Sequence, residues 1–256
     1  MAIIETNDLT KIYVLGRGKE VVGLNKVSLK VEEGEIFGIL GPNGSGKTTC
    51  LKLLLGILFP TEGEISIMGK NQFDVEVKEN IGFLPENPYY YDYLTGPELL
   101  HFYGRLFNMN KEEIKERTEY LLSLVKLSEV KKLTLRHYSK GMLERIGLAA
   151  ALINDPKILI LDEPTTGLDP IGCLETRDLL IQLKKQGKTI LLSSHFLSEV
   201  ERVCSRIGIF HRGYLLTTGT LEGLISQYNA NNLEELFVKT IEEFDSNYKK
   251  EWGMRK

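Results

Sequence analysis

The sequence predicts an α/β fold with a mixed, mainly parallel sheet, an N-terminal antiparallel β subdomain and an inserted helical subdomain. Three observations lead to this prediction. The apolar strand Ile36–Leu40 runs into a glycine-rich loop and then into a helical pattern from Lys47 to about Phe59, which is how a β-α-β unit begins. The Ile/Leu runs 158–161 and 189–193 are typical of strands covered on both faces of a parallel sheet. Residues 95–153, in contrast, have a mostly helical pattern.

The first 40 residues alternate between apolar and polar side chains, as they do around Leu29 and Val31. A period of two is typical of strands with one buried face, and we assign these residues to the antiparallel β subdomain. Gly16 and Gly18 interrupt the alternation and predict a loop or hairpin.

The middle of the chain contains successive helical patterns at Gly96–Asn108, Lys111–Lys126 and Lys140–Ile153. We interpret residues 87–156 as a helical subdomain inserted into the core of one domain that spans residues 1–220. Two short helical patterns, Leu221–Tyr228 and Leu233–Phe244, form a tail over residues 221–256. We expect the last ten or so residues to fray.

Composition and charge are those of an ordinary globular protein. Of the 256 residues, 42% are hydrophobic, and 35 acidic against 32 basic side chains leave a net charge of −3. A nucleic-acid surface needs a basic patch, so we expect no nucleic-acid partner. Apolar runs reach only about eight residues, whereas a membrane span needs about 20, so we expect that the chain does not cross a membrane by itself.

The sequence also predicts the cellular location of the chain and the redox state of its cysteines. No basic start precedes an apolar stretch near Met1, so we expect no secretory signal and a cytosolic location. Cys50, Cys173 and Cys204 are far apart in the sequence and have no metal-ligand spacing. We therefore interpret them as reduced core thiols.

Residues 41–48 fit the pattern G-x-x-x-x-G-K-[ST] of a phosphate-binding loop, with a strand before it and a helix after it, as in a P-loop NTPase core. Glycines let backbone N–H groups turn toward one anion, and the helix that begins near Lys47 points its own N–H groups there. Charge-assisted hydrogen bonds contribute roughly 1.5–3 kcal/mol each, so the amides and Lys47 should dominate binding, with Thr48 holding Mg²⁺. The alternative is a glycine-rich turn with an exposed lysine. The predicted binding residues of the loop are Gly41, Pro42, Asn43, Gly44, Ser45, Gly46, Lys47 and Thr48.

Polar side chains follow three of the predicted buried strands. Asp162 and Glu163 end one strand, His195 ends another, and Glu86 follows the short strand 81–84. In open parallel sheets, ligands bind outside the carboxyl ends of the strands, so these residues and the phosphate-binding loop together favour a nucleotide-hydrolysis site. Taken singly, the Asp-Glu pair is explained better as a helix cap, and the histidine as a partly buried structural residue.

The chemistry of hydrolysis suggests a role for each of these side chains. We expect Asp162 to reach Mg²⁺ through water, because Mg²⁺ usually keeps several waters and takes few carboxylates. Glu163 points the other way along the chain and is placed to orient and deprotonate the attacking water. His195 is expected to hydrogen-bond the γ-phosphate. Phosphoryl transfer requires mainly such positioning and charge stabilisation.

The order of these motifs resembles that of ATP-binding cassette (ABC) transporter ATPases over nearly the whole chain. Residues 41–49 resemble the Walker A loop, which extends the expected ATP-binding residues to Thr49, and residues 158–164 resemble the Walker B strand with its following glutamate. Residues 167–169 resemble the D-loop, and residues 193–195 resemble the switch-histidine segment.

Two further segments complete the resemblance. Residues 10–13 resemble the segment whose aromatic ring stacks on adenine, which makes Tyr13 the expected adenine contact. Residues 138–142 stand at the position of the signature motif, ahead of Walker B. The signature residues expected to act in trans are Ser139, Lys140 and Gly141, and Ser139 is suited to cap the helix behind it.

The resemblance implies a mechanism that needs two cassettes. They face each other head to tail, with each ATP between the Walker A loop of one and the signature of the other. The expected partners are a second cassette, either identical or closely related, and transmembrane permease subunits. These subunits would hold the cytoplasmic chain on the inner face of the cell membrane. The expected cofactors are ATP and Mg²⁺.

Two positions depart from the family pattern. Glu86 stands where the family usually has glutamine, and because a carboxylate cannot donate a hydrogen bond as an amide does, Glu86 either binds Mg²⁺ or orders water. The usual Leu-Ser-Gly-Gly-Gln signature is Tyr-Ser-Lys-Gly-Met here, so Lys140 adds a charge near the phosphate contact. Both variants resemble the single-cassette subunits that pair with ABC-2-type permeases, which are mostly exporters.

Four tyrosines occur in residues 87–93, directly after Glu86. Tyrosine is enriched at protein interfaces, and we hypothesise that this segment lines the groove for a cytoplasmic helix of the membrane subunit. The alternative is that the rings pack inside the helical subdomain. Burial of all four rings within the isolated chain would exclude the interface.

An ATPase that powers transport is therefore the expected function. The alternative is a soluble ABC-type ATPase of DNA repair or translation. The repair type would need a long coiled-coil insertion between Walker A and the signature, and the translation type would need two cassettes in one chain; the sequence has neither pattern. A nucleotide-binding regulator without hydrolysis would be favoured only if Glu163 were missing.

Overall fold

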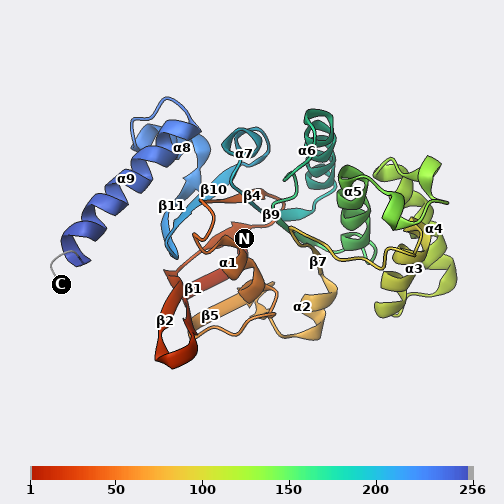
Figure 1. Cartoon of the computed structure of the whole chain (residues 1–256), viewed down its shortest axis with the longest axis horizontal. Helices are drawn as coiled ribbons and strands as arrows, with labels where there is room; N and C mark the ends of the chain where they lie inside the picture. Colours follow the sequence, from red (N-terminus) through yellow and green to blue (C-terminus); the bar gives the residue numbers. More distant parts are fainter. Residues whose placement is uncertain (1, 253–256) are drawn as a thin grey trace. The chain divides into compact units, whose positions relative to one another are not determined.

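The computed structural model describes residues 2–252, with the backbone alone at positions 17 and 249–252 (Figure 1). The chain forms two compact units. The first unit runs to Gln72 and resumes at Ser193, and the second unit is Phe73–Leu192. No helix among the described residues is long and apolar enough to cross a membrane. The predicted limits of the domain, 1–220, of its helical part, 87–156, and of the tail, 221–256, stay predictions.

The first unit contains most of the strands. Its elements are β1 (Ala2–Val14), a 3-10 turn (Gly16–Gly18), β2 (Glu20–Val27), β3 (Lys30–Glu32), β4 (Ile36–Leu40), α1 (Lys47–Leu54), β5 (Glu62–Ile67), β6 (Lys70–Asn71), α7 (Leu197–Val203), β10 (Arg206–His211), β11 (Tyr214–Thr220), α8 (Leu221–Gln227) and α9 (Leu233–Trp252).

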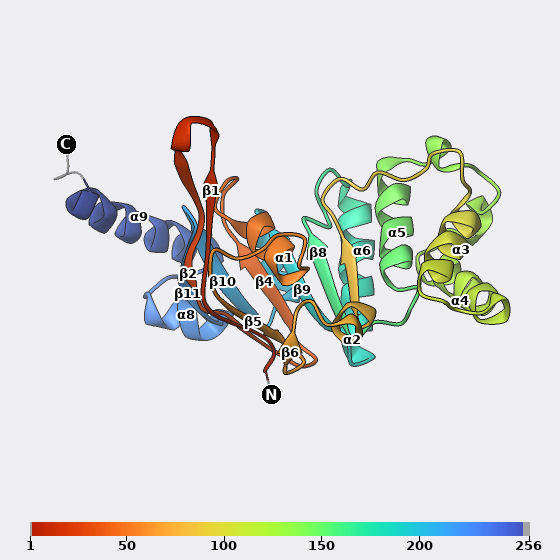
Figure 2. The ribbon, with the colours of Figure 1, turned by 90° about the horizontal axis from the view of Figure 1, so that it is seen from below.

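An antiparallel sheet forms the N-terminal part of this unit, as predicted. Strand β1 pairs antiparallel with β2, β3 and β5, and β5 pairs with β6. The Leu15 N–H donates to the Lys19 carbonyl at 2.7 Å and closes the β1–β2 hairpin around Gly16 and Gly18, where the sequence predicts a turn. Figure 2 shows this hairpin extending past the end of β5.

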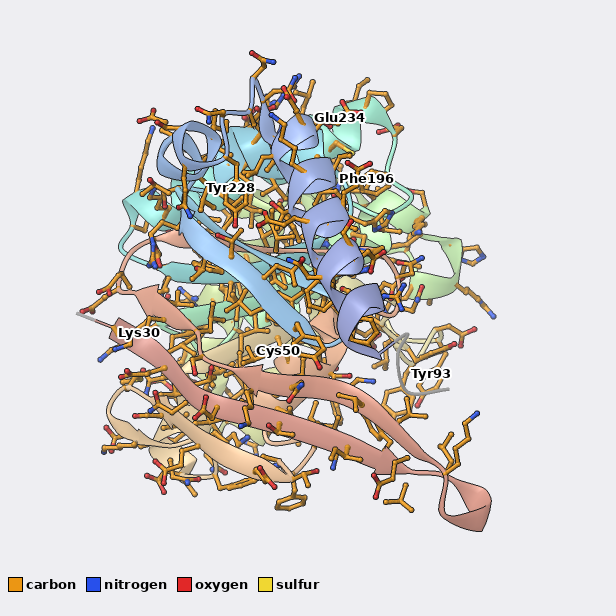
Figure 3. All side chains as sticks on the ribbon, turned by 90° about the vertical axis from the view of Figure 1, so that its left-hand side faces the viewer. Lys30, Cys50, Tyr93, Phe196, Tyr228 and Glu234 are labelled. Atoms are coloured by element: carbon orange, nitrogen blue, oxygen red, sulfur yellow. The ribbon has the colours of Figure 1, made fainter. Side chains whose placement is uncertain are left out.

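A second set of strands places the phosphate-binding loop. All five residues of β4 are buried, which is the pattern of a strand covered on both faces. Strand β10 pairs with β4 in parallel, and β11 pairs antiparallel with β10. Helix α7 packs against β4, where Gly38 leaves room for Val200 and Cys204. Figure 3 shows α9 lying across β11.

The second unit contains the remaining strands and most of the helices. Its elements are α2 (Val75–Glu79), β7 (Ile81–Leu84), α3 (Gly96–Leu106), α4 (Lys111–Leu124), two 3-10 turns (Ser128–Val130 and Leu135–His137), α5 (Lys140–Ala151), β8 (Ile158–Asp162), α6 (Pro170–Lys185) and β9 (Thr189–Ser194), whose last two residues belong to the first unit.

Local sequence signals account for the elements of the second unit. Strands β7 and β8 pair in parallel, and β9 lies next to β8. Helices α3 and α4 each begin with a capping box, in which Thr95 pairs with Glu98 and Asn110 with Glu113. Helices α3, α4 and α5 pack against one another, and Gly82 lets β7 approach the Ala151 carbonyl of α5.

Two helix ends differ from the predictions. Helix α1 ends at Leu54, not near Phe59, because Gly56 adopts a left-handed conformation with φ +64° and the chain turns away. Helix α9 continues past Phe244 to Trp252, because its aromatic side chains keep packing on the sheet at helical spacing. The fraying expected beyond Trp252 lies outside the described residues.

The cysteines are free thiols, as predicted. Cys50 and Cys204 are buried, and Cys173 is half-buried. Burial raises the pKa of the Cys50 thiol to about 12, so this side chain stays protonated and behaves as a small apolar core residue.

Candidate nucleotide site

The phosphate-binding loop follows β4 and has the backbone that its glycines predict. Gly44 has φ +78° and Gly46 has φ +108°, conformations that side chains disfavour. Gly46 is also constrained by space, since a Cβ there would lie 2.7 Å from the Gly23 carbonyl oxygen and 2.8 Å from Leu24. The loop therefore needs glycine at position 46 for its conformation and for its close packing.

The first turn of α1 presents N–H groups to the loop. Gly46 is the N-cap, and no side chain caps the helix or adds an acidic charge to its first turn. Backbone N–H groups at such an end attract anions, since the helix dipole also favours negative charge there. This end of α1 is therefore suited to a phosphate group.

Two polar side chains of the loop are buried. Lys47 is 6% exposed, and its ammonium donates to the Gly41 carbonyl at 2.7 Å and lies 3.5 Å from the Pro42 carbonyl. Ser45 is 2% exposed, and its hydroxyl has no hydrogen-bond partner among the described residues. A buried polar group without a partner is costly, so the Ser45 hydroxyl indicates a site built for a ligand that hydrogen-bonds to it.

Tyr13, the predicted adenine contact, lies in the same unit near the loop. Its hydroxyl is 3.2 Å from the Thr49 hydroxyl, and the Lys11 ammonium lies 5.5 Å from the ring centroid. Gly23 lies so close to the ring that a Cβ there would be 2.5 Å from Tyr13. These contacts hold the ring next to α1, which begins with the phosphate-binding loop's lysine.

A contact that sequence reasoning missed supports the loop from the side of β10 and β11. The turn between these strands donates the Gly213 N–H to the Ser45 carbonyl at 2.8 Å, and the Gly213 carbonyl accepts from Asn25 at 2.8 Å. The sequence signal is the Arg-Gly pair at positions 212 and 213, but only the fold shows that it forms a turn that meets the loop.

His195 is the first residue after β9 and is exposed. Its ring lies 4.0 Å from that of Phe196 at an interplanar angle of 38°. The Phe196 N–H donates to the Ser194 hydroxyl at 2.9 Å, which fixes the chain direction after the strand. The interpretation of His195 as a partly buried structural residue is therefore wrong.

Asp162 and Glu163 lie in the second unit, at the end of β8. They are 4% and 5% exposed, respectively. Glu163 has φ +54°, a strained conformation for a residue with a side chain, and its carboxylate accepts from the Thr166 hydroxyl at 3.4 Å. Neither residue caps α6, because the N-cap is Asp169, which accepts from the Gly172 N–H at 2.6 Å. The helix-cap interpretation of the pair is therefore wrong.

The signature segment begins α5 in the second unit. The Ser139 hydroxyl accepts from the Met142 N–H at 3.3 Å, which confirms the predicted N-cap. A cavity of about 450 Å³ lies at this helix end and is bounded on its other side by Gly167 and Asp169. Ser139 and Lys140 are exposed there, so the segment is open to a partner molecule.

Oxygen donors of the kind that Mg²⁺ prefers are present in both units: Thr48 in the first, Asp162 and the exposed Glu86 in the second. The described residues contain no group of three or more His, Cys, Asp or Glu side chains that could hold a metal. Mg²⁺ keeps several waters and takes phosphate oxygens as ligands, so an all-protein cage is not required, and each of these donors is of a type that the ion accepts.

Comparison with known proteins identifies relatives of the chain. The ABC transporter family pattern matches residues 24–166. An uncharacterised ABC transporter ATP-binding protein of Synechocystis sp. is 47% identical over 223 residues, which are 86% of this chain and 63% of that protein. The chain thus spans less than two thirds of that relative. The bacitracin transport ATP-binding protein of Bacillus licheniformis is 43% identical over 84% of this chain and 68% of its own length.

A solved structure has the same fold. It is the dimeric structure of a post-hydrolysis state of an ATP-binding cassette bound to ADP and Pi. The TM-score is 0.77 at 28% identity, covering 85% of this chain and 98% of that one. This similarity confirms the predicted P-loop NTPase fold.

Proposed function

The chain belongs to the family of ABC transporter ATP-binding proteins, and from this premise we propose that it is an ATP-hydrolysing subunit that powers a membrane transporter. The phosphate-binding loop carries the proposal. It contains two buried polar groups, the ammonium of Lys47 and the hydroxyl of Ser45, and that hydroxyl has no hydrogen-bond partner among the described residues. A hydrogen-bonding anion satisfies both groups.

ATP binding uses the residues of the first unit. The loop residues 41–46 surround the phosphates with backbone N–H groups, and Lys47 turns from the loop carbonyls to the phosphate oxygens. Thr48 supplies a hydroxyl to Mg²⁺. The Tyr13 ring, held beside Thr49, stacks on adenine.

Hydrolysis uses carboxylates of the second unit. Asp162 would help to hold Mg²⁺, which when bound would neutralise charge on the phosphate oxygens. Glu163 orients the attacking water and accepts its proton; the strained backbone and the Thr166 hydroxyl fix the direction of its carboxylate. His195 hydrogen-bonds the γ-phosphate. Glu86, exposed after β7, binds Mg²⁺ or orders water.

A second cassette completes each ATP site. The N-terminus of α5, with Ser139, Lys140 and Gly141, meets the γ-phosphate of the ATP held by the partner. The exposure of this segment beside an open cavity supports the role, and so does the dimeric structure of the related cassette. Two copies of this chain, or this chain and a close relative, form the pair.

The tyrosine surface, Tyr89, Tyr91 and Tyr93, is the proposed contact with a permease. These rings are 98%, 54% and 64% exposed, so the condition that would have excluded an interface is not met. Exposed aromatic groups of this size are typical of docking surfaces. Through this contact the subunit is held on the inner face of the cell membrane.

Tyr90 has a different role from its neighbours. Burial raises the pKa of its hydroxyl above the usual value, and Gly147 of α5 leaves room for that hydroxyl. The ring lines a cavity of about 320 Å³ in the second unit, together with Tyr103 and Phe107. Tyr90 thus anchors the segment that presents the tyrosine surface.

The direction of transport is proposed as export by an ABC-2-type permease. The departures at Glu86 and Lys140 support this branch, and one relative is named for bacitracin transport. The soluble alternatives in DNA repair and translation gain no support, since the relatives named above are transporter subunits or carry the transporter family name.

Phosphate release from ATP by the purified chain tests the function. We expect hydrolysis with Mg²⁺ by the wild-type chain, at least a hundredfold slower hydrolysis by Glu163→Gln with ATP binding kept, and no binding by Lys47→Ala. Equal hydrolysis by the wild type and Glu163→Gln would overturn the assignment of the base. Unchanged ATP affinity of Lys47→Ala would overturn the phosphate-binding loop.

A further inference from the structure

The turn between β10 and β11, residues 211–213, lies directly against the phosphate-binding loop. The Gly213 N–H donates to the Ser45 carbonyl at 2.8 Å, and a Cβ at Gly46 would lie 3.4 Å from the Gly213 α-carbon. Gly213 itself has φ +85°, and its carbonyl accepts from Asn25. A shift of this turn therefore moves the backbone that carries the Ser45 hydroxyl.

Helix α9 holds the same turn from its other side. The Asp245 carboxylate forms an ion pair with the Arg212 guanidinium, with 3.2 Å between Oδ1 and Nε, and the same Oδ1 lies 3.1 Å from His211 Nε2. The Arg212 Nε–H donates to His211 Nε2 at 3.2 Å, so the three side chains form one cluster. The side chains of Asp245 and His211 are 28% and 13% exposed, and that of Arg212 is 52% exposed, so the His211 side of the cluster is the part shielded from water. The Phe244 ring packs edge-on against His211, with 5.7 Å between the ring centroids.

The burial of α9 lies mainly in its other half. Leu233 and Leu236 are 1% and 0% exposed, and Thr240 is 3% exposed, whereas Asp245 lies beyond them on the chain. These buried side chains, and the packing of Phe244 and Tyr248 on Tyr214, contribute to holding α9 on the sheet independently of Asp245. The ionic contact of Asp245 is therefore separable from the packing that anchors the helix.

We infer that Asp245 is a positioning residue: it holds the turn 211–213 against the phosphate-binding loop and so sets the affinity for nucleotide phosphates. The inference rests on the proposed function, because it assigns α9 a role in the same site. The path runs from Asp245 through Arg212 and Gly213 to Ser45, and its steps are an ion pair, a peptide bond and a backbone hydrogen bond. Contacts along such a path change binding by roughly two- to thirtyfold.

The test is ADP binding with Mg²⁺ by calorimetry, since ADP is not hydrolysed. We expect Asp245→Ala to weaken ADP binding about three- to tenfold, and the nearly isosteric Asp245→Asn to weaken it less, because its carbonyl still accepts. Glu242→Ala, which removes an exposed acidic charge from the same helix, is the matched control and should bind ADP as the wild type does. In steady-state hydrolysis Asp245→Ala should raise KM for ATP and leave kcat unchanged.

A double-mutant cycle separates a positioning role from general destabilisation. If Asp245 acts through Arg212, then Arg212→Ala weakens ADP binding too, and Asp245→Ala/Arg212→Ala loses no more than the larger single effect. Wild-type affinity of both Asp245 variants, or fully additive losses in the cycle, would overturn the inference. Lys47→Ala separates a failure of the proposed function from a failure of the inference about Asp245. If Lys47→Ala binds ADP normally, the proposed function fails. If Lys47→Ala loses ADP binding and Asp245→Ala does not, only the role of Asp245 fails.

Discussion

The side chain of Lys140 runs along the α-carbon of Gly167, in the space that a Cβ at that position would occupy. Gly167 has φ +76°, a conformation that favours glycine, and its lack of a side chain leaves the space that Lys140 fills. The contact joins the first residue of α5 in the signature segment to the D-loop of the same unit. The Lys140 side chain therefore has a defined packing position against Gly167.

Replacing Gly167 by alanine should displace Lys140 and weaken the ATP-dependent dimer. The added Cβ also costs about 1–2 kcal/mol of folding stability at a positive φ. Gly187→Ala is the matched control: it has φ +86° and open space around its α-carbon, so it carries the backbone cost alone. Sedimentation with ATP in the Glu163→Gln background measures dimer affinity. Equal dimer affinity of the two glycine variants would contradict a role for the Lys140 contact.

Glu144 should make the free energy of unfolding depend on pH. It is 3% exposed, its Oε2 atom has no hydrogen-bond partner among the described residues, and burial raises its pKa from 4.5 to about 7, an effect reduced by the nearby Lys140. The folded state therefore holds this proton more tightly than the unfolded state. The contribution of Glu144 to the free energy of unfolding should be largest below pH 4.5 and should be lost as the pH rises from 4.5 to about 7.

Glu144→Gln should remove this loss of stability. The amide matches the shape of the protonated acid and carries no charge, so at pH 8 the variant should be more stable than the wild type by about 1–3 kcal/mol. Urea unfolding at pH 5 and pH 8 measures the difference. The same change in the free energy of unfolding between these pH values in both proteins would show that Glu144 does not cause the dependence.

The Ser45 hydroxyl should matter for nucleotide binding and not for folding. Ser45→Ala removes a buried hydroxyl that has no partner among the described residues, so the free energy of unfolding should stay the same or rise slightly. Affinity for ADP should fall about fivefold, which corresponds to one hydrogen bond of about 1 kcal/mol. Thermal unfolding and calorimetry on the same samples check both effects. A destabilised variant with normal affinity would mean that the hydroxyl is structural.

The tyrosine surface and its anchor should respond differently to substitution. Tyr89→Ala should change the stability of the isolated chain by less than about 0.5 kcal/mol, because the ring is 98% exposed. Tyr90→Ala should cost about 2 kcal/mol or more, since it empties a packed position against α5. Co-purification with the permease should fall for Tyr89→Ala. Undiminished recovery of the permease with Tyr89, Tyr91 and Tyr93 all replaced would exclude the contact.

Local signals account for the parts of the fold and site that the sequence predicts. The phosphate-binding loop is specified by glycines and a lysine at fixed spacing, and the buried strands by short Ile/Leu runs. The Ser139 cap is likewise visible because a cap concerns residues only three apart. Each of these features depends on neighbouring residues in the chain.

The features that the sequence does not predict depend on contacts between distant segments. The contact of Gly213 with Ser45 joins residues more than 160 positions apart, and the link of Asp245 to Arg212 exists only because α9 folds back over β11. The positive φ of Glu163 has no composition signal, since such a backbone is normally marked by glycine or asparagine. The early end of α1 was missed because Gly56 stands inside a run that is otherwise helical and apolar.

ATP-driven dimerisation is tested most directly by the mass of Glu163→Gln in solution, measured with and without ATP by size-exclusion chromatography with light scattering. Because this variant should bind ATP without hydrolysing it, we expect a monomer without nucleotide and a stable dimer with ATP and Mg²⁺. Ser139→Ala, in the same background, should weaken the dimer because the signature contact is lost. A monomer under all conditions, in a preparation that calorimetry shows to bind ATP, would contradict an ATP-driven pair of cassettes.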